Sequence, residues 1–266
     1  MSPWERLLEK PQPRGHFLQL YRPGDDASLV SNTGIYLSEG LKRGEGALIV
    51  AEPCHCTSFL AEVGRYGIDT ATAVGEHRMV VRDAEQTLAT FMNSGQPDWN
   101  RFEHSIGSAL AEVRSSGVPP HVRVYGEMVG VLWNQRQYGA AARLEQFWNR
   151  LLTRFSFSLY CSYSIDVLEK EFHARALDGI LCTHTHVLPS DSQGRLEVAL
   201  QAAMESVLGG KAQRIRNLIQ ANYKSSWAVM PGAESAILWL RRNLPDQAEQ
   251  IVNLTRAQLG ASARPA

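Results

Sequence analysis

The chain has 266 residues, of which 44% are hydrophobic and 20% are charged, so it can form one large core or one core and a small additional module. Its 27 basic and 27 acidic residues give a formal net charge of +0, which excludes a general electrostatic attraction to nucleic acid or an anionic membrane. No apolar run approaches the roughly 20 residues of a membrane-spanning helix, and four cysteines at this length do not indicate a disulfide framework. The charged N-terminal segment is unlike a signal peptide, and we expect a cytoplasmic protein with reduced thiols.

Five short runs rich in β-branched or aromatic residues predict strands before residue 165. Helix-like segments separate them, and this alternation predicts an α/β fold with a mostly parallel sheet and helices on both faces. The runs are HFLQLY, ALIVAE, MVVRDA, VRVYGE and FSLYCSY, at residues 16–21, 47–52, 79–84, 122–127 and 157–163.

Polar residues that favour helix starts and glycines that favour helix ends mark the intervening helices. The expected starts and ends are Asp26 or Ser28 to Gly44, Thr57 or Ser58 to Gly67, and Asp98 to Gly117. Apolar residues at helical spacing also predict a helix with one broad buried face over residues 135–154.

Strand signals fade after about Phe172, and the remaining chain has a helical pattern. An apolar stripe from Leu196 to Leu208 predicts one helix, and further helices are expected near 211–224, 232–243 and 245–259. The expected organisation is therefore an α/β domain at 14–170, a linking region at 171–193 and a small helical module at 194–260.

The turn after the first predicted strand lies where nucleotide-binding α/β domains carry a phosphate loop. Such a loop needs glycines to cradle phosphates, a lysine, and a Ser or Thr for the metal. Here Gly24 is the sole glycine of the turn, Asp25 and Asp26 add negative charge, and no lysine lies between Lys10 and Lys42. The position suggests an NTPase and the chemistry argues against one, so we assign no catalytic residue and no cofactor.

Ligands of open parallel sheets bind beyond the carboxyl ends of the strands. Residues at these predicted ends form the candidate ligand site: Arg22, Glu52, His55, Asp83, Glu127 and Tyr163. His55 is either ligand-facing or a solvated residue at a helix start. Glu127 is either part of the ligand site or an exposed helix cap.

Two patterns of cysteine and histidine invite comparison with metal sites. Cys54, His55 and Cys56 are adjacent, so on a helix start they point in different directions, and no matching pair follows at zinc spacing. Cys182, His184 and His186 alternate on one side of an extended segment, a pattern more typical of a packed turn. No metal site is predicted, and the roles of Cys54, Cys56, His184 and His186 stay open.

An ordered set of motifs extends over residues 14–168: His16 with Leu20-Tyr21, EGLKRGEGALIVAEP, His55, GRYGID, DAEQTLATFM with GQPD, Arg101-Phe102, YGEMVGVLW, RLEQFWN and FSLYCSY. Together they resemble the MEDS family, the DcmR-type sensory domain of methylotrophs and methanogens. The resemblance implies a fold related to RecA/KaiC-type ATPases with a degenerate phosphate loop. It also implies the sensing of small organic, hydrocarbon-derived molecules. Such domains are often attached to histidine kinases or transcriptional output domains, but no kinase core follows here.

The leading hypothesis is a non-enzymatic cytoplasmic sensor that binds a small organic ligand and relays its state to a protein partner through the helical module. One alternative is a divergent nucleotide-binding protein or weak ATPase, in which Arg22 or an arginine of another subunit replaces the missing lysine. A second is a ligand-responsive transcriptional regulator. The stretch 223–230 is too long for the turn of a helix-turn-helix, so nucleic acid is not an expected partner. A membrane is not an expected partner either, and whether the protein forms a homo-oligomer stays open.

Overall fold

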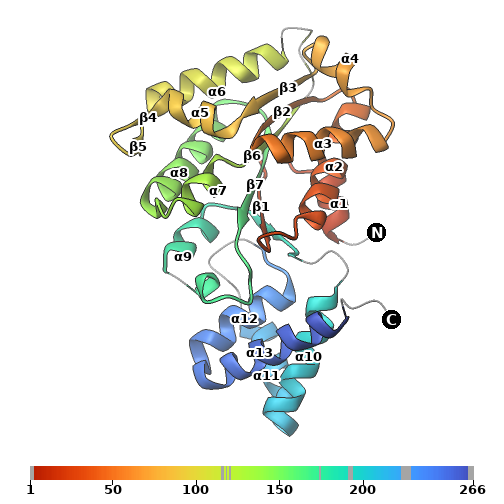
Figure 1. Ribbon diagram of the computed structural model, residues 1–266, viewed down its shortest axis with the longest axis vertical. Coiled ribbons are helices and arrows are strands. Elements are labelled where there is room, and N and C mark those ends of the chain that lie inside the picture. The colour runs from red at the N-terminus through yellow and green to blue at the C-terminus, as the bar shows by residue number, and fades with distance from the viewer. Residues whose placement is uncertain are drawn as a thin grey trace.

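The computed structural model contains a six-stranded sheet between two layers of helices, with a group of C-terminal helices at one end (Figure 1). It describes residues 3–114, 117, 119, 121–173, 175–190, 194–222 and 229–262. The strand order is β3-β2-β6-β7-β1-β8, and all pairings in this sheet are parallel, as predicted. The strands are β1 (His16–Tyr21), β2 (Gly46–Ala51), β3 (Met79–Asp83), β6 (Val122–Gly126), β7 (Ser158–Ser164) and β8 (His186–Leu188).

Both faces of the sheet are buried, which explains why its strands read as continuous apolar runs. Phe17 faces one helical layer and Leu18 the other, because successive side chains of a strand point to opposite faces. The first layer is α1 (Pro3–Glu9), α2 (Ala27–Lys42), α3 (Pro53–Arg65) and α4 (Thr70–Gly75). The second is α5 (Ala84–Phe91), α6 (Trp99–Val113), α7 (Met128–Asn134), α8 (Tyr138–Arg154) and α9 (Arg175–Leu181), with the short hairpin of β4 (Met92–Asn93) and β5 (Gln96–Pro97) between α5 and α6.

Two elements differ from the sequence-based expectation. The prediction that strands end before residue 172 is wrong, because β8 pairs with β1 from Phe17↔His186 to Gln19↔Leu188. A strand of three residues is too short to show a period of two. The helix expected to begin at Thr57 or Ser58 begins instead at Pro53, since the fixed φ of proline suits the first helical position.

Arg123 fastens α1 to the sheet. Its fully buried guanidinium donates hydrogen bonds to the carbonyl oxygens of Leu8, Glu9 and Tyr36 and pairs with Glu45. Gly40 makes room for this side chain, since a Cβ there would lie 2.5 Å from Arg123 Cδ.

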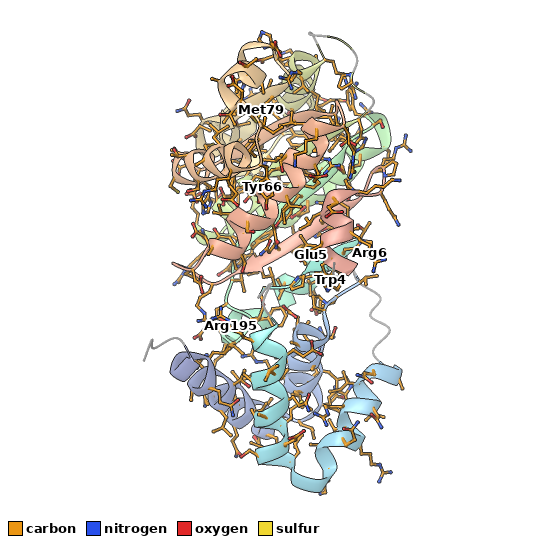
Figure 2. All side chains as sticks on the ribbon, turned by 90° about the vertical axis from the view of Figure 1, so that its right-hand side faces the viewer. Trp4, Glu5, Arg6, Tyr66, Met79 and Arg195 are labelled. Carbon is orange, nitrogen blue, oxygen red and sulfur yellow. The ribbon has the colours of Figure 1, made fainter. Side chains whose placement is uncertain are left out.

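The position of α1 matters because it approaches the C-terminal helices. Figure 2 shows Trp4 and Glu5 of α1 at the end of the α/β domain nearest to Arg195. Side chains from α1 can therefore face those of the helical region.

The C-terminal helices are α10 (Arg195–Leu208), α11 (Ala212–Asn222), α12 (Gly232–Asn243) and α13 (Pro245–Ser262), close to the predicted bounds. Leu200 and Met204 of α10 lie in the same continuous apolar cluster as Leu18 of the sheet. Arg241 of α12 donates to the carbonyl oxygens of residues 167–169, after β7. Within the described residues, no helix is both long and apolar enough to cross a membrane.

Candidate ligand site

Glu127 is the centre of a polar group at the carboxyl ends of β2 and β6. It follows β6 and precedes α7, but its side chain makes no cap hydrogen bond to the helix and is only 2% exposed. Its Oε2 accepts a hydrogen bond from the backbone N–H of Glu52 at 2.9 Å, and its Oε1 lies 2.5 Å from Nδ1 of His55. The side chain is therefore a buried acceptor and not the exposed cap that was the alternative.

His55 lies between two carboxylates. Its Nδ1 faces Glu127, and its Nε2 lies 3.2 Å from Oδ2 of Asp26. The ring stacks on Phe59 and meets the edge of Tyr21. Because both ring nitrogens face acceptors, both are donors and the ring is an imidazolium.

The charges of this group shift its proton affinities. The hydrogen bond to Glu127, working against burial, raises the pKa of His55. Burial, followed by the charge of Glu127, raises the pKa of Glu52. We call Asp26, Glu52, His55 and Glu127 the strand-end group. The imidazolium of His55 is shared between carboxylates, and it is the one cation of this group that a phosphate could meet.

The structure brings together three of the six predicted site residues, Glu52, His55 and Glu127. Arg22 instead pairs with Asp166 at 3.1 Å, with 45% of its side chain exposed. The other two predicted residues also bond elsewhere. Asp83 caps α5 by accepting from the N–H of Gln86, and the buried Tyr163 hydroxyl donates to Glu145 at 2.6 Å.

The strand order explains the separation of Arg22 from this group. Glu52 and Glu127 follow β2 and β6, which are neighbours, whereas Arg22 follows β1, which β6 and β7 separate from β2. Asp26, expected as a helix cap and as a negative charge in the turn, makes no side-chain cap bond and reaches His55. A capping aspartate and a site aspartate look alike in a sequence, so nothing there could distinguish them.

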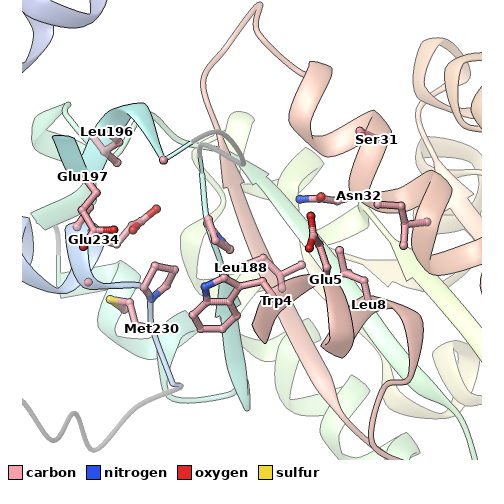
Figure 3. Close-up of a pocket in the computed structure, with 16 residues that line it drawn as sticks. Trp4, Glu5, Leu8, Ser31, Asn32, Leu188, Leu196, Glu197, Met230 and Glu234 are labelled. Atoms are coloured by element: carbon pink, nitrogen blue, oxygen red, sulfur yellow. The ribbon is translucent and has the colours of Figure 1, made fainter. Parts of the chain in front are cut away.

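A cavity of about 410 Å³ lies apart from the strand-end group, between the α/β domain and the C-terminal helices (Figure 3). This volume is typical of sites for small molecules. Helices α1, α2, α10 and α12 and the end of β8 all contribute to its wall. Its lining residues are Trp4, Glu5, Leu8, Ser31, Asn32, Ile35, Leu188, Pro189, Gly194, Leu196, Glu197, Met230, Pro231, Gly232, Ala233 and Glu234.

The charged side chains of this cavity are all acidic. Glu5, Glu197 and Glu234 line it, and no lysine or arginine is among its described lining residues. Glu234 is 2% exposed, and its Oε1 accepts hydrogen bonds from the N–H and hydroxyl of Ser190. The wall thus suits an uncharged or cationic molecule better than an anion.

Comparison with known proteins supplies the context for this geometry. The family model for the methanogen/methylotroph, DcmR sensory domain (MEDS) matches residues 15–185, from the residue before β1 to the residue before β8. Comparison with curated proteins finds no match. Because the match extends over most of the chain, the protein belongs to the MEDS family of sensory domains.

Proposed function

We propose that this protein is a sensor that binds a small organic molecule in the cavity between the α/β domain and the C-terminal helices. The observation that carries the proposal is the composition of the wall, which takes side chains from α1 and α2 on one side and from α10 and α12 on the other. A ligand there contacts both parts of the chain. The membership in a family of sensory domains supports the same function.

The lining indicates the class of ligand. Trp4, Leu188 and Met230 provide apolar surface, and Figure 3 shows them around one end of the cavity. Glu5 and Glu197 can accept hydrogen bonds from hydroxyl or ammonium groups. Small alcohols and amines fit this chemistry, and the phosphates of a nucleotide would meet like charge.

The relay to a protein partner would pass through α12. One end of this helix bonds to the segment after β8 through Glu234 and Ser190. Its other end bonds to the segment after β7 through Arg241. A ligand that prefers one arrangement of α10 and α12 over another would shift the population of the two and change the surface offered to the partner.

Of the two alternatives, nucleotide hydrolysis finds least support. Asp26 and Glu127 both engage His55, and Arg22 engages Asp166. We therefore propose that the protein is not an enzyme and that Mg-ATP is not hydrolysed. A steady-state phosphate-release assay tests this, and turnover that Glu127→Gln abolishes would favour the ATPase instead.

A transcriptional regulator would need free cations on its helical module. Arg241 is 6% exposed and bonds to backbone carbonyls, and Arg242 pairs with Asp178 at 2.7 Å. Two arginines of the helical module are thus engaged within the chain. Residues 223–228, part of the stretch that the sequence indicates is too long for the turn of a helix-turn-helix, lie outside the described residues.

A cavity-filling variant tests the sensor proposal. Gly232, the first residue of α12, lines the cavity, and a Cβ there would meet only Glu197 Oε1, at 3.6 Å. Gly139, near the start of α8, has no atom within 4 Å of such a Cβ and is a matched control. Both Gly232→Trp and Gly139→Trp should therefore fold.

Thermal unfolding would be measured with propanol, isobutanol, isopropylamine and ATP. We expect at least one alcohol or amine to raise the Tm of the wild type and of Gly139→Trp, and to have no effect on Gly232→Trp. An equal shift in all three proteins would move the site away from this cavity. A shift with ATP alone would contradict the ligand class.

A further inference from the structure

Four chemically reactive side chains meet beneath the second helical layer, and none of them belongs to the strand-end group or lines the cavity. We call His16, Glu145, Cys161 and His184 the buried cluster; none is more than 5% exposed. His16 begins β1, Cys161 lies in β7, Glu145 lies in α8, and His184 precedes β8. Leu18 is the register partner of Cys161, so His16, two residues earlier on the same face, reaches the same place.

The four side chains direct their ligand atoms at one point. Nε2 of His16 lies 3.3 Å from Oε2 of Glu145 and 3.4 Å from Sγ of Cys161. Nε2 of His184 lies 3.5 Å from Oε1 of Glu145. One ligand atom from each of the four residues lies within 4.8 Å of all the others.

Hydrogen bonds to residues outside the cluster orient the ring of His16. Its Nδ1 lies 2.9 Å from Oδ1 of Asn149 and 3.1 Å from the carbonyl oxygen of Thr183. The amide of Asn149 donates to that same carbonyl at 2.8 Å, which identifies Oδ1 as an acceptor. Nδ1 of His16 therefore donates, which leaves Nε2, the atom that faces Cys161 and Glu145, as the one available to bind a cation.

His184 is oriented in the same way. Its Nδ1 lies 2.8 Å from the carbonyl oxygen of Ile180 and so is the donor. In a neutral ring its Nε2 thus directs a lone pair at the carboxylate of Glu145.

This arrangement leaves buried polar atoms without partners. Among the described residues, neither Oε2 of Glu145 nor Nε2 of His184 makes a hydrogen bond. The thiol proton of Cys161 can serve Nε2 of His16, but it cannot also serve the other two atoms. These buried atoms are satisfied only if a cation lies among them, either a proton on an imidazole, as at His55, or a metal ion.

The spacing of these atoms is compatible with a bound metal ion. Four atoms bound tetrahedrally to Zn²⁺ at about 2.0–2.3 Å lie about 3.3–3.8 Å apart. Four partners of a water, at about 2.7–3.0 Å from it, lie about 4.4–4.9 Å apart. The separations of 3.3, 3.4 and 3.5 Å, which involve both carboxylate oxygens of Glu145, lie in or near the range for a metal, and one ligand atom from each of the four residues lies within 4.8 Å of the others.

We propose that His16, Glu145, Cys161 and His184 form a binding site for a divalent transition metal, with Zn²⁺ as the expected ion. Two imidazoles, one thiolate and one carboxylate are ligands that Zn²⁺ accepts, and binding would release the thiol proton of Cys161 to solvent. The hydroxyl of Tyr163, which is not itself a proposed ligand, donates to Oε1 of Glu145 at 2.6 Å and would orient the carboxylate.

The site is closed and structural in character, because four protein ligands leave no open position and none is exposed above 5%. It would join α8, β1 and β7 to the segment that leads into β8. Neither the proposed sensing function nor its ligand is needed for this inference.

The experiment uses the full chain, with Zn²⁺ and Co²⁺ as probes. We expect about one zinc per chain after purification without chelator, and a cobalt–thiolate charge-transfer band after chelation and addition of Co²⁺. A folded, chelated wild type that binds neither ion would overturn the proposal without any variant.

Variants then assign the ligands. Cys161→Ser should lose the charge-transfer band, and Tyr163→Phe should weaken Co²⁺ binding about 10–100-fold with the band retained. Cys182→Ser and His186→Gln are matched controls, close in sequence to His184 but outside the cluster, and should retain stoichiometry and band. Loss of the band in Cys182→Ser, or its retention in Cys161→Ser, would place the metal elsewhere and contradict the assignment.

Discussion

His55 and His184 each lie against a buried glutamate, Glu127 and Glu145 respectively, yet their hydrogen bonding differs. In the strand-end group both nitrogens of His55 face carboxylates, and the backbone N–H of Glu52 supplies a further donor. In the buried cluster the Nδ1 atoms of His16 and His184 donate to carbonyl and amide oxygens, so in a neutral ring each Nε2 brings no hydrogen toward Glu145.

The difference shows what decides the role of a buried histidine. Where the nitrogen that points away from the glutamate meets another carboxylate, as in His55, the ring keeps two protons and the group is satisfied by the protein alone. Where the nitrogen that points away from the glutamate donates to a backbone carbonyl, the tautomer of the neutral ring is fixed. The nitrogen facing the glutamate is then available as a ligand. The same residue types thus give a proton-sharing group in one place and the proposed metal ligands in another.

Removal of Glu127 should produce the largest effect. Glu127→Ala leaves the imidazolium of His55 and the N–H of Glu52 without their buried acceptor, so we expect a loss of about 3–5 kcal/mol in the free energy of unfolding. Urea denaturation followed by circular dichroism measures it. A loss below about 1 kcal/mol would mean that the strand-end group is not satisfied internally as described.

The strand-end group should also make stability depend on pH. The raised pKa of His55 means that its contribution is fully present below the unfolded value of about 6.5 and is lost as pH rises through the folded pKa. The free energy of unfolding should therefore fall above neutral pH in the wild type. The fall should be smaller in His55→Phe, which keeps a ring against Phe59; equal slopes would contradict the prediction.

The corresponding change in the buried cluster should be nearly neutral when no metal is bound. In Glu145→Gln the amide oxygen can keep the bond from Tyr163, and the amide N–H can serve a histidine Nε2 that now lacks a donor. We expect chelated Glu145→Gln to lie within about 1 kcal/mol of the chelated wild type in urea denaturation. A loss as large as that of Glu127→Ala would erase the distinction between the two groups.

Arg22 should have the smallest effect. Its ion pair with Asp166 is partly exposed, so Arg22→Ala should cost about 0–1 kcal/mol. Because Arg22 contacts neither His55 nor Glu127, the pH dependence of stability should be unchanged. A changed pH profile, measured beside that of the wild type, would show that Arg22 belongs to the strand-end group after all.

Local pattern was sufficient for the elements and for the family. The five strands predicted from β-branched and aromatic runs are all present, and the start of α6 after Asp98 agrees with the capping prediction. The motif set along residues 14–168 pointed to the family whose model matches residues 15–185. These features depend on neighbouring residues, and the sequence contains them directly.

The composition of the two polar groups depended on tertiary structure. The pairing of β2 with β6 put Glu52 beside Glu127, and the pairing of β1 with β7 and β8 put His16 beside Cys161 and His184. Periodicity tells which face of a strand is buried, but the neighbours of that strand are chosen by crossover connections and by packing of the whole helical layers. Strand ends, helix caps and the segment with Cys182, His184 and His186 were therefore visible in the sequence. Which of them share a site was decided only by the assembled sheet.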